Sequence, residues 1–525
     1  MNELNQLYYG DNLEILRYDV KNPGKFLIEN ESVDVIYIDP PFNSDRDYNV
    51  IYESDGHDAA AQVKAFSDTW SLIGVEDLES IIEKEQIRYA NIQQAYDVFK
   101  KLLRDGDRYD RSMYAYLINM ALRISELHRK LKPSGTFFLH CDTTAAKYLQ
   151  ILLDCVFGQG NFLNEIIWHY QTGGTSKHWF SRKHDNIYFY AKNIKKHFFA
   201  PEKIKISRTP EVLKRISSGI ESATRSKGEF KLPHDVLIIP AINSMAKERM
   251  GYPTQKPLEL LRTLLKATCP MAGDKMKDGS TAQTNGRVLD AFCGCGTTIA
   301  AAQEMGMSWI GIDITYLAVD LILKQRLLPQ YYGLNEDLTN YKESLNKLKK
   351  DVFLYGIPKD LESAKALVEV GKLRKEFEKW AVLSVGGVPQ DKLGADGGVD
   401  GVFYVNETQK ERVKGYVSVK SGVVSVKDVR DFESALNFKN SPIGIFITLE
   451  EATKPMLEFI QSLKSFDSAW YGKIPKITLI QVRDIIENPN TIPPYIRSVL
   501  KQSKNISTPK NATFDDEFYD DEGGD

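Results

Sequence analysis

A run of apolar residues ends at four residues that could position a nitrogen nucleophile. Residues 33–38 read VDVIYI, which is typical of a buried strand, and Asp39, Pro40, Pro41 and Phe42 follow. The Asp39 carboxylate and the Pro40 carbonyl supply two acceptors, and the prolines fix the backbone without adding N–H donors. Two acceptors directed at both hydrogens of a base's exocyclic amine would localise its lone pair, while Phe42 stacks on the base.

A second stretch, residues 287–314, predicts a strand, a glycine turn, a helix and another strand. Gly294 and Gly296 let the backbone approach a ligand closely. Asp313 ends the second strand, where a carboxylate suits ribose hydroxyls. Asp290 ends the first strand and would repel a pyrophosphate. This turn therefore favours a cationic cofactor without phosphate, such as S-adenosylmethionine.

Both stretches also have structural interpretations, a strand ending in a Pro-Pro turn and an ordinary turn with two surface acids. Their presence together favours a site. A nicotinamide-dependent Rossmann enzyme is a third interpretation, but Thr297, Thr298 and Ile299 follow Gly296, so the third glycine of its fingerprint is missing.

These motifs resemble those of the beta-class amino DNA methyltransferases, which modify adenine N6 or cytosine N4. The family's D/N/S-P-P-Y/F/W tetrapeptide matches residues 39–42, and its F-x-G-x-G motif matches residues 292–296. The tetrapeptide precedes the cofactor motif by about 250 residues, as in the beta class. PTQKPLELLRTLL (residues 253–265) and YYGDNLEIL (residues 8–16) match two further motifs. The resemblance covers roughly residues 1–330.

The resemblance implies catalytic roles for Asp39, Pro40, Pro41 and Phe42. The cofactor-binding residues that it implies, together with the turn above, are Asp11, Lys256, Pro257, Asp290, Phe292, Gly294, Gly296, Thr297, Thr298 and Asp313. Cys295 replaces the serine common in the cofactor turn. Asp rather than Ser at position 39 favours adenine N6 by family tendency, and cytosine N4 stays an alternative.

Such a site reaches a base in double-stranded DNA only if the base flips out of the helix. The stretch from Lys177 to Lys231 has 14 Lys and Arg against 5 Asp and Glu, so it can contact phosphates or form a solvated surface. We expect target recognition from residues 173–250 and from an insertion at 43–110, whose polar sequence predicts irregular structure. A homodimer or a separate restriction subunit stays open.

The C-terminal part has a second candidate site. Asp400 opens a predicted strand, Lys420 ends the next, and Glu378 lies on the preceding helix. A nuclease could use such a set, with Asp400 holding Mg²⁺ and Lys420 positioning the attacking water. The region resembles the Mrr-like branch of the PD-(D/E)xK restriction endonucleases. Ser418 replaces the usual acid two residues before the lysine, so cleavage and inactive DNA binding both stay open.

Composition predicts a soluble, cytoplasmic protein, and the resemblance to DNA methyltransferases implies a prokaryotic or phage type. The 525 residues are 42% hydrophobic and 26% charged, without a signal-peptide pattern or an apolar run of membrane-spanning length. The five cysteines are too few and scattered for a disulfide framework. Net charge is −3, and the stretch from Asp515 to Asp525 contributes seven acids.

The expected fold class is α/β, with a Rossmann-like, S-adenosylmethionine-dependent methyltransferase sheet that is parallel and doubly wound. A smaller α/β restriction-endonuclease-like domain follows. We expect a methyltransferase domain at 1–335, a helical connector at 336–374, the endonuclease-like domain at 375–490 and a disordered acidic tail at 504–525. The predicted function is methylation of adenine N6 in DNA within a restriction–modification system, and the alternative is a bifunctional restriction enzyme.

Overall fold

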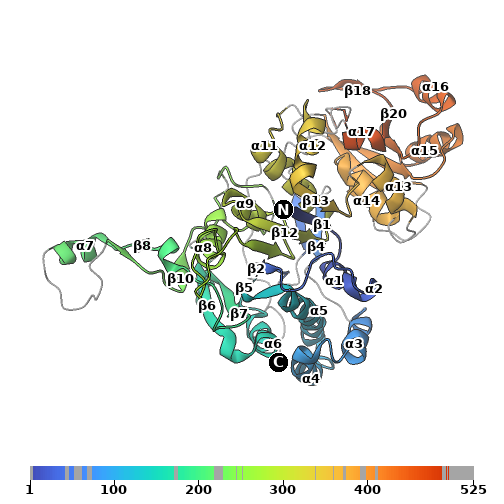
Figure 1. The fold of residues 1–525 in the computed structure, drawn as a ribbon. Helices are drawn as coiled ribbons and strands as arrows, with labels where there is room; N and C mark the ends of the chain where they lie inside the picture. The colour runs from blue at the N-terminus through green and yellow to red at the C-terminus, as the bar shows by residue number, and fades with distance from the viewer. Residues whose placement is uncertain are drawn as a thin grey trace.

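The chain forms two α/β units in its computed structural model (Figure 1). The structure describes residues 4–41, 47–51, 62–67, 74–170, 175–217, 229–243, 245–250, 252, 254–336, 339–358, 360–369, 374–390, 398–407, 412–487, 492–493 and 495. The predicted acidic tail lies outside these residues. Within them, no helix has the length and apolar character needed to span a membrane.

Within the described residues, the larger unit is built on a sheet of nine strands. Their order across the sheet is β10 (Val236–Ile238), β6 (Phe162–His169), β7 (His184–Ala191), β5 (Leu131–Cys141), β2 (Val33–Ile38), β11 (Arg287–Asp290), β12 (Ser308–Asp313), β1 (Asn5–Tyr9) and β13 (Val352–Tyr355). All pairings are parallel except those of β7, which runs antiparallel to both β5 and β6. The predicted parallel sheet is therefore confirmed except at β7, which is antiparallel because β6 and β7 form a hairpin.

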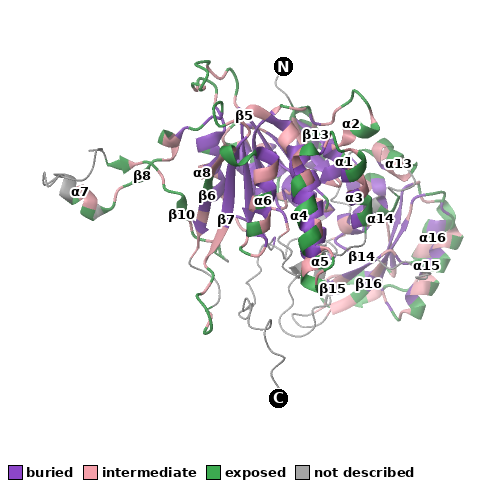
Figure 2. Cartoon of the chain, turned by 90° about the horizontal axis from the view of Figure 1, so that it is seen from below, coloured by how far each residue is buried: buried purple, intermediate pink, exposed green. Residues whose placement is uncertain are grey.

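Helices cover both faces of this sheet. They are α1 (Asn12–Leu16), α5 (Arg108–Lys130) and α6 (Ala146–Phe157) on one face, and α8 (Leu258–Thr268), α9 (Thr297–Glu304) and α12 (Tyr341–Asp351) on the other. Alternate residues of β2 point to opposite faces, so Ile36 and Ile38 pack with the first set, and Val35 and Tyr37 with the second. Every residue of β2 is buried, which explains why its sequence is apolar apart from Asp34. Figure 2 shows the strands of the large sheet mostly in purple, the colour of buried residues.

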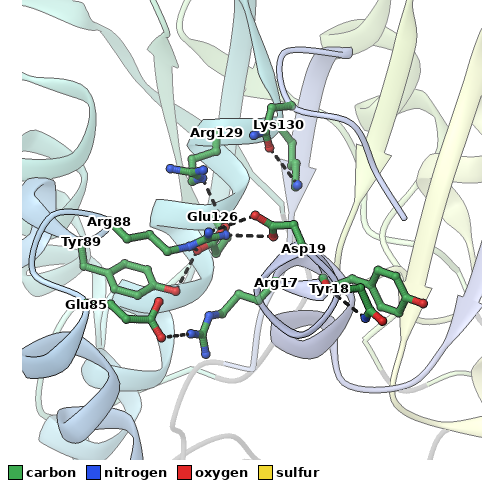
Figure 3. A network of polar contacts seen from close by, with 11 residues as sticks. Arg17, Tyr18, Asp19, Glu85, Arg88, Tyr89, Glu126, Arg129 and Lys130 are labelled. Atoms are coloured by element: carbon green, nitrogen blue, oxygen red, sulfur yellow. Dashed lines mark hydrogen bonds and ion pairs between the residues drawn. The ribbon is translucent and has the colours of Figure 1, made fainter. Parts of the chain in front are cut away.

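The insertion at 43–110 is more regular than its polar sequence predicts. It contains the hairpin β3 (Asp47–Ile51) and β4 (Gln62–Ser67), and the helices α3 (Val75–Lys84) and α4 (Gln93–Leu103). Arg88, between α3 and α4, donates two hydrogen bonds to Asp19 at 3.0 and 3.1 Å and two to Glu126 at 2.6 and 2.8 Å (Figure 3). This bridge joins the insertion to α5 and to α2 (Tyr18–Lys21).

The predicted connector at 336–374 is helical only in part. Its middle is the strand β13, which pairs with β1 and extends the large sheet, between α12 and α13 (Leu361–Glu369). The basic region before α8 contains α7 (Pro210–Ser217), β8 (Ile206–Ser207) and β9 (Phe230–Lys231). Figure 1 shows α7 and β8 extending well away from the sheet.

The smaller unit has its own sheet of five strands within the described residues. Their order is β14 (Val388–Pro389), β15 (Gly401–Asn406), β16 (Arg412–Lys420), β17 (Gly444–Thr448) and β20 (Ile477–Gln481). Its helices are α14 (Arg374–Ser384), α15 (Val426–Phe438), α16 (Lys454–Ser462) and α17 (Val482–Glu487). Trp380 on α14 meets Tyr316 of the larger unit edge to face, with ring centroids 6.3 Å apart.

Candidate active site

A cavity of about 370 Å³ opens at the carboxyl edge of the large sheet. The ends of β2, β11 and β12 meet there, because these strands run parallel and are neighbours. The sequence-predicted residues that line it are Asp11, Asp39, Pro40, Pro41, Lys256, Asp290, Phe292, Gly294, Thr297, Thr298 and Asp313. Pro257 and Gly296 lie beside this lining, and Phe42 is outside the described residues.

Asp39 is engaged on one side only. Its Oδ2 accepts a hydrogen bond from Lys256 Nζ at 2.6 Å, and both side chains are largely buried. Its Oδ1 is buried and has no hydrogen-bond partner among the described residues. A buried carboxylate oxygen without a donor costs free energy, so this atom is ready to accept a hydrogen bond from a ligand.

The glycine turn brings its backbone to the cavity. Gly294 and Gly296 have φ values of +47° and +75°, a region that favours glycine. A Cβ at Gly296 would lie 2.6 Å from Ile322 Cγ1, so a side chain there would collide with its neighbour. Arg326 is buried behind the turn, and its Nε donates to the Cys295 carbonyl at 2.5 Å.

Two buried carboxylates face the cavity beside the turn. Asp290 accepts hydrogen bonds from Thr298 Oγ1 at 2.6 Å and from the Phe292 N–H at 3.0 Å. Burial nevertheless raises the pKa of Asp290 to about 7. Burial also raises the pKa of Asp313, whose Oδ2 accepts from the Gly294 N–H at 2.8 Å. A cavity lined by such acids favours a cationic ligand.

Asp11 and its neighbours form the other end of the cavity lining. Asp11 caps α1, and its Oδ1 accepts from two backbone N–H groups of that helix. Arg123 donates to Asp11 Oδ2 at 2.8 Å and to Asn12 Oδ1 at 2.6 Å. Asn12 in turn donates to the Ala291 carbonyl at 2.7 Å. The sequence prediction missed Arg123 and Asn12, although Asn12 stands next to Asp11.

A buried chain of hydrogen-bonded side chains, also missed, runs from β2 across the sheet. The Tyr37 hydroxyl lies 2.8 Å from His140 Nδ1, and His140 Nε2 lies 3.1 Å from Asp185 Oδ2. Tyr170 donates its hydroxyl hydrogen to Asp185 Oδ1 at 3.1 Å. Tyr37 shares a face of β2 with Asp39, since the two are two residues apart, and this spacing was the available signal.

The candidate nuclease residues come together in the smaller unit. Asp400 Oδ2 accepts from the Val419 N–H at 2.7 Å. Burial raises the pKa of Asp400, and the hydrogen bond from Val419 and the charge of Lys420 offset part of this rise. Burial also raises the pKa of Glu378, and the charge of Asp400 adds to the rise. Across the described residues, no three His, Cys, Asp or Glu side chains gather as a metal-binding group, so a Mg²⁺ ion would rely on two acids and water.

Family models match both units. A family model described as "DNA methylase" matches residues 33–324, and one described as "Restriction endonuclease" matches residues 376–487. A type II methyltransferase, M.HpaI of Haemophilus parainfluenzae, is 27% identical over 229 residues, which cover 44% of this chain and 65% of its own. The EcoPI Mod subunit of a type III restriction–modification enzyme from Escherichia phage P1 is 30% identical over 193 residues, 37% of this chain and 25% of its own.

Other relatives are matched over different shares of their length. DNA adenine methyltransferase YhdJ of Escherichia coli is 24% identical over 239 residues, 45% of this chain and 76% of its own. The chain thus spans less than two thirds of M.HpaI and of the Mod subunit. Among solved structures, the cytosine-N4-specific PvuII DNA methyltransferase is 13% identical with a TM-score of 0.35, over 67% of this chain and 94% of its own. Because the first family model covers more than half of the 525 residues, the chain belongs to the DNA methylase family.

Proposed function

We propose that this chain transfers a methyl group from S-adenosylmethionine to N6 of an adenine in double-stranded DNA. The observation that carries the proposal is Asp39 Oδ1, a buried acceptor without a donor at the edge of an acid-lined cavity. An amine N–H of the target base is the donor that this atom lacks.

The residues of the cavity fit the proposed cofactor. When bound, S-adenosylmethionine supplies an electrophilic methyl group on a sulfonium, together with an α-ammonium and a ribose. The acids Asp290 and Asp313 suit these cationic and hydroxyl groups. The positive-φ glycine turn leaves room for a ligand against the backbone.

The chain's own groups would orient the target amine. We assign to Asp39 Oδ1 one amine hydrogen and to the Pro40 carbonyl the other, which directs the nitrogen lone pair at the methyl carbon. The bound cofactor would supply the methyl group, and the proton that the amine gives up would pass to Asp39 Oδ1, the acceptor assigned to it here. Lys256 keeps the other oxygen of Asp39 occupied, so the carboxylate presents one defined acceptor.

Adenine N6 is favoured over cytosine N4 by Asp39 at the first position of the tetrapeptide. The named activity of the relative YhdJ agrees with this choice. The Mod subunit belongs to a restriction–modification enzyme, and we propose such a context here, in the cytoplasm of a prokaryotic cell.

The proposal is tested by tritium transfer from labelled S-adenosylmethionine to DNA, and by mapping modified bases in DNA from cells that express the chain. We expect Asp39→Ala to lose at least about 10²-fold in kcat. Asp278→Ala is the matched control, because Asp278 lies in an exposed loop and bonds only locally to Ser280. Full activity in Asp39→Ala contradicts the assigned mechanism, and a methylated cytosine contradicts the choice of base.

A second activity, Mg²⁺-dependent DNA cleavage, is favoured by the clustering of Glu378 and Asp400 beside Lys420. In this proposal Asp400 and Glu378 hold the metal ion, and Lys420 positions the attacking water. Cleavage of unmethylated DNA should require Mg²⁺ and should be lost in Lys420→Ala. It should survive in Lys454→Ala, which changes an exposed lysine on α16. Absence of cleavage by the unaltered chain on unmethylated DNA that carries its mapped site contradicts this activity.

A further inference from the structure

The hairpin of β6 and β7 leaves the large sheet at the edge that carries the active site. β5 runs parallel to β2, and β7 runs antiparallel to both β5 and β6. β6 therefore runs in the same direction as β2. The Tyr170 N–H donates to the Lys183 carbonyl at 3.0 Å and extends the pairing beyond both strands. Three inter-strand steps separate β6 from β2, about 14 Å in all, comparable with the ~12 Å width of a DNA major groove.

The base of this hairpin is joined to the catalytic strand. Asp185, at the second position of β7, contacts His140 on β5, and His140 contacts Tyr37 on β2. Tyr170 at the other side of the hairpin also bonds to Asp185. His140 and Tyr37 are buried, so these hydrogen bonds hold the base of the hairpin in a fixed position relative to Tyr37. Asp39 follows Tyr37 by two residues.

The described part of the connection between β6 and β7, residues 175–183, presents two aromatic rings to solvent. Phe180 is 99% exposed and Trp179 is 47% exposed. The loop that carries them is tied internally, since Ser176 Oγ accepts from the N–H groups of His178 and Trp179 at 3.2 and 3.3 Å. The Ser176 N–H donates to Ser181 Oγ at 3.0 Å. A fully exposed phenylalanine gains no burial from the chain itself, so its ring is accessible for stacking on another molecule.

The charges around the two rings fit a nucleic acid. Residues 175–184 include Lys177, Arg182 and Lys183 and contain no Asp or Glu. Lys177 and Arg182 are exposed on either side of the aromatic pair. This pattern, cations flanking an aromatic ring, suits phosphates on both sides of a stacked base. An apolar patch on a protein partner would gain nothing from these flanking cations.

We propose that Phe180 enters the DNA duplex beside the target and stacks in the space that the flipped adenine leaves. The inference rests on the proposed function, since it requires a base extruded towards Asp39. Extrusion leaves a gap and an unpaired partner base, and an aromatic ring filling that gap replaces the lost stacking. The Trp179 ring lies beside that of its sequence neighbour His178, with ring centroids 6.0 Å apart.

The test uses duplexes that carry the mapped recognition site. With 2-aminopurine at the target position, we expect the unaltered chain to raise its fluorescence and Phe180→Ala to raise it less. On the adenine duplex, Phe180→Ala should lose about 10- to 100-fold in kcat/KM, and Phe180→Trp should retain most of the activity. Phe438→Ala, which removes an 88% exposed ring at the end of α15, should change neither measurement.

A duplex with an abasic site opposite the target separates stacking from other roles. Here no partner base needs support, so the loss in Phe180→Ala should fall below about threefold. An equal loss on both duplexes, or no loss on either, overturns the inference while methyl transfer by the unaltered chain upholds the proposed function. A chain that transfers no methyl group to DNA and raises no fluorescence overturns both.

Discussion

Two buried charged clusters in the larger unit use their acids in opposite ways. In the tether cluster, Asp19, Arg88 and Glu126, each of the four carboxylate oxygens accepts a hydrogen bond from Arg88 (Figure 3). In the cleft cluster, Asp39, Lys256 and Asp290, one oxygen of Asp39 has no partner in the described structure. The first cluster joins helices, whereas the second leaves an acceptor for a ligand.

The electrostatics of the two clusters show the same contrast. Burial would raise the pKa of Asp19, but its hydrogen bonds to Arg88 reverse the effect and lower that pKa. At Asp290 burial dominates, and the pKa rises to about 7. A structural cluster thus forms all its hydrogen bonds and ion pairs when the chain folds. In a binding cluster, some of these interactions form only when the ligand binds. Changes in the two clusters should therefore separate stability from activity.

The largest expected effect is on stability, from Arg88→Met. It removes the guanidinium shared by the partly buried Asp19 and the fully buried Glu126, and should lower the free energy of unfolding by about 3–5 kcal/mol. Urea unfolding followed by circular dichroism measures the change. Lys21→Ala breaks an exposed ion pair to Glu14 and should leave the transition unmoved. An Arg88→Met chain as stable as the original would mean that the tether does not hold the insertion.

Asp39→Asn should give the opposite result, with activity lost and stability retained. The amide keeps the size of the side chain but removes the charge that pairs with Lys256 and polarises the amine. We expect a loss of about 10²-fold in single-turnover methyl transfer. The unfolding transition should move far less than in Arg88→Met. Comparable losses of stability in the two variants would remove the distinction between the clusters.

Proton release on cofactor binding tests the cleft cluster at Asp290. A pKa raised to about 7 means that the folded chain holds a proton there between about pH 4 and 7, which the unfolded chain has lost. This contribution to stability is complete below pH 4 and is lost as the pH rises through 7. A sulfonium ligand favours the carboxylate, so binding should release up to one proton below pH 7 and none well above it.

Calorimetry in buffers of different ionisation enthalpy measures that proton. Asp290→Asn removes the titrating group, so it should abolish the release and weaken cofactor binding about tenfold at pH 8. The same proton count in Asp290→Asn as in the unaltered chain would assign the release to another group.

Local sequence patterns were sufficient where the chemistry lies in consecutive residues at the end of a strand. The tetrapeptide follows β2 directly, and Asp290 and Asp313 are the last residues of β11 and β12. Parallel strands place their carboxyl ends at one edge, so these residues meet whatever the loops between them do. The pairing of Asp39 with Lys256 is different, because 217 residues separate them and no local signal links an acid to that lysine.

Two features of the fold were missed. Helix α3 has apolar residues at helical spacing, Val75, Leu78, Ile81 and Ile82, within a mostly charged segment, and its buried Glu79 accepts a hydrogen bond from Tyr114 at 2.5 Å. The reversal of β7 was missed because a buried apolar strand reads alike in either direction. The direction of a strand and the burial of an acid both depend on tertiary contacts, and periodicity along the sequence does not reveal those contacts.

The smallest effects should come from a matched pair of hydroxyl deletions, Tyr89→Phe and Thr298→Val. The Tyr89 hydroxyl donates to Glu126 at 2.8 Å, and Arg88 still holds that acid, so its loss should cost about 1 kcal/mol of stability and no activity. The Thr298 hydroxyl holds down the pKa of Asp290, so Thr298→Val should move the proton-release range to higher pH. Urea unfolding and calorimetry are carried out on both variants. The contrast between the clusters is contradicted if Tyr89→Phe alters proton release, or if Thr298→Val leaves the pH range of proton release unchanged.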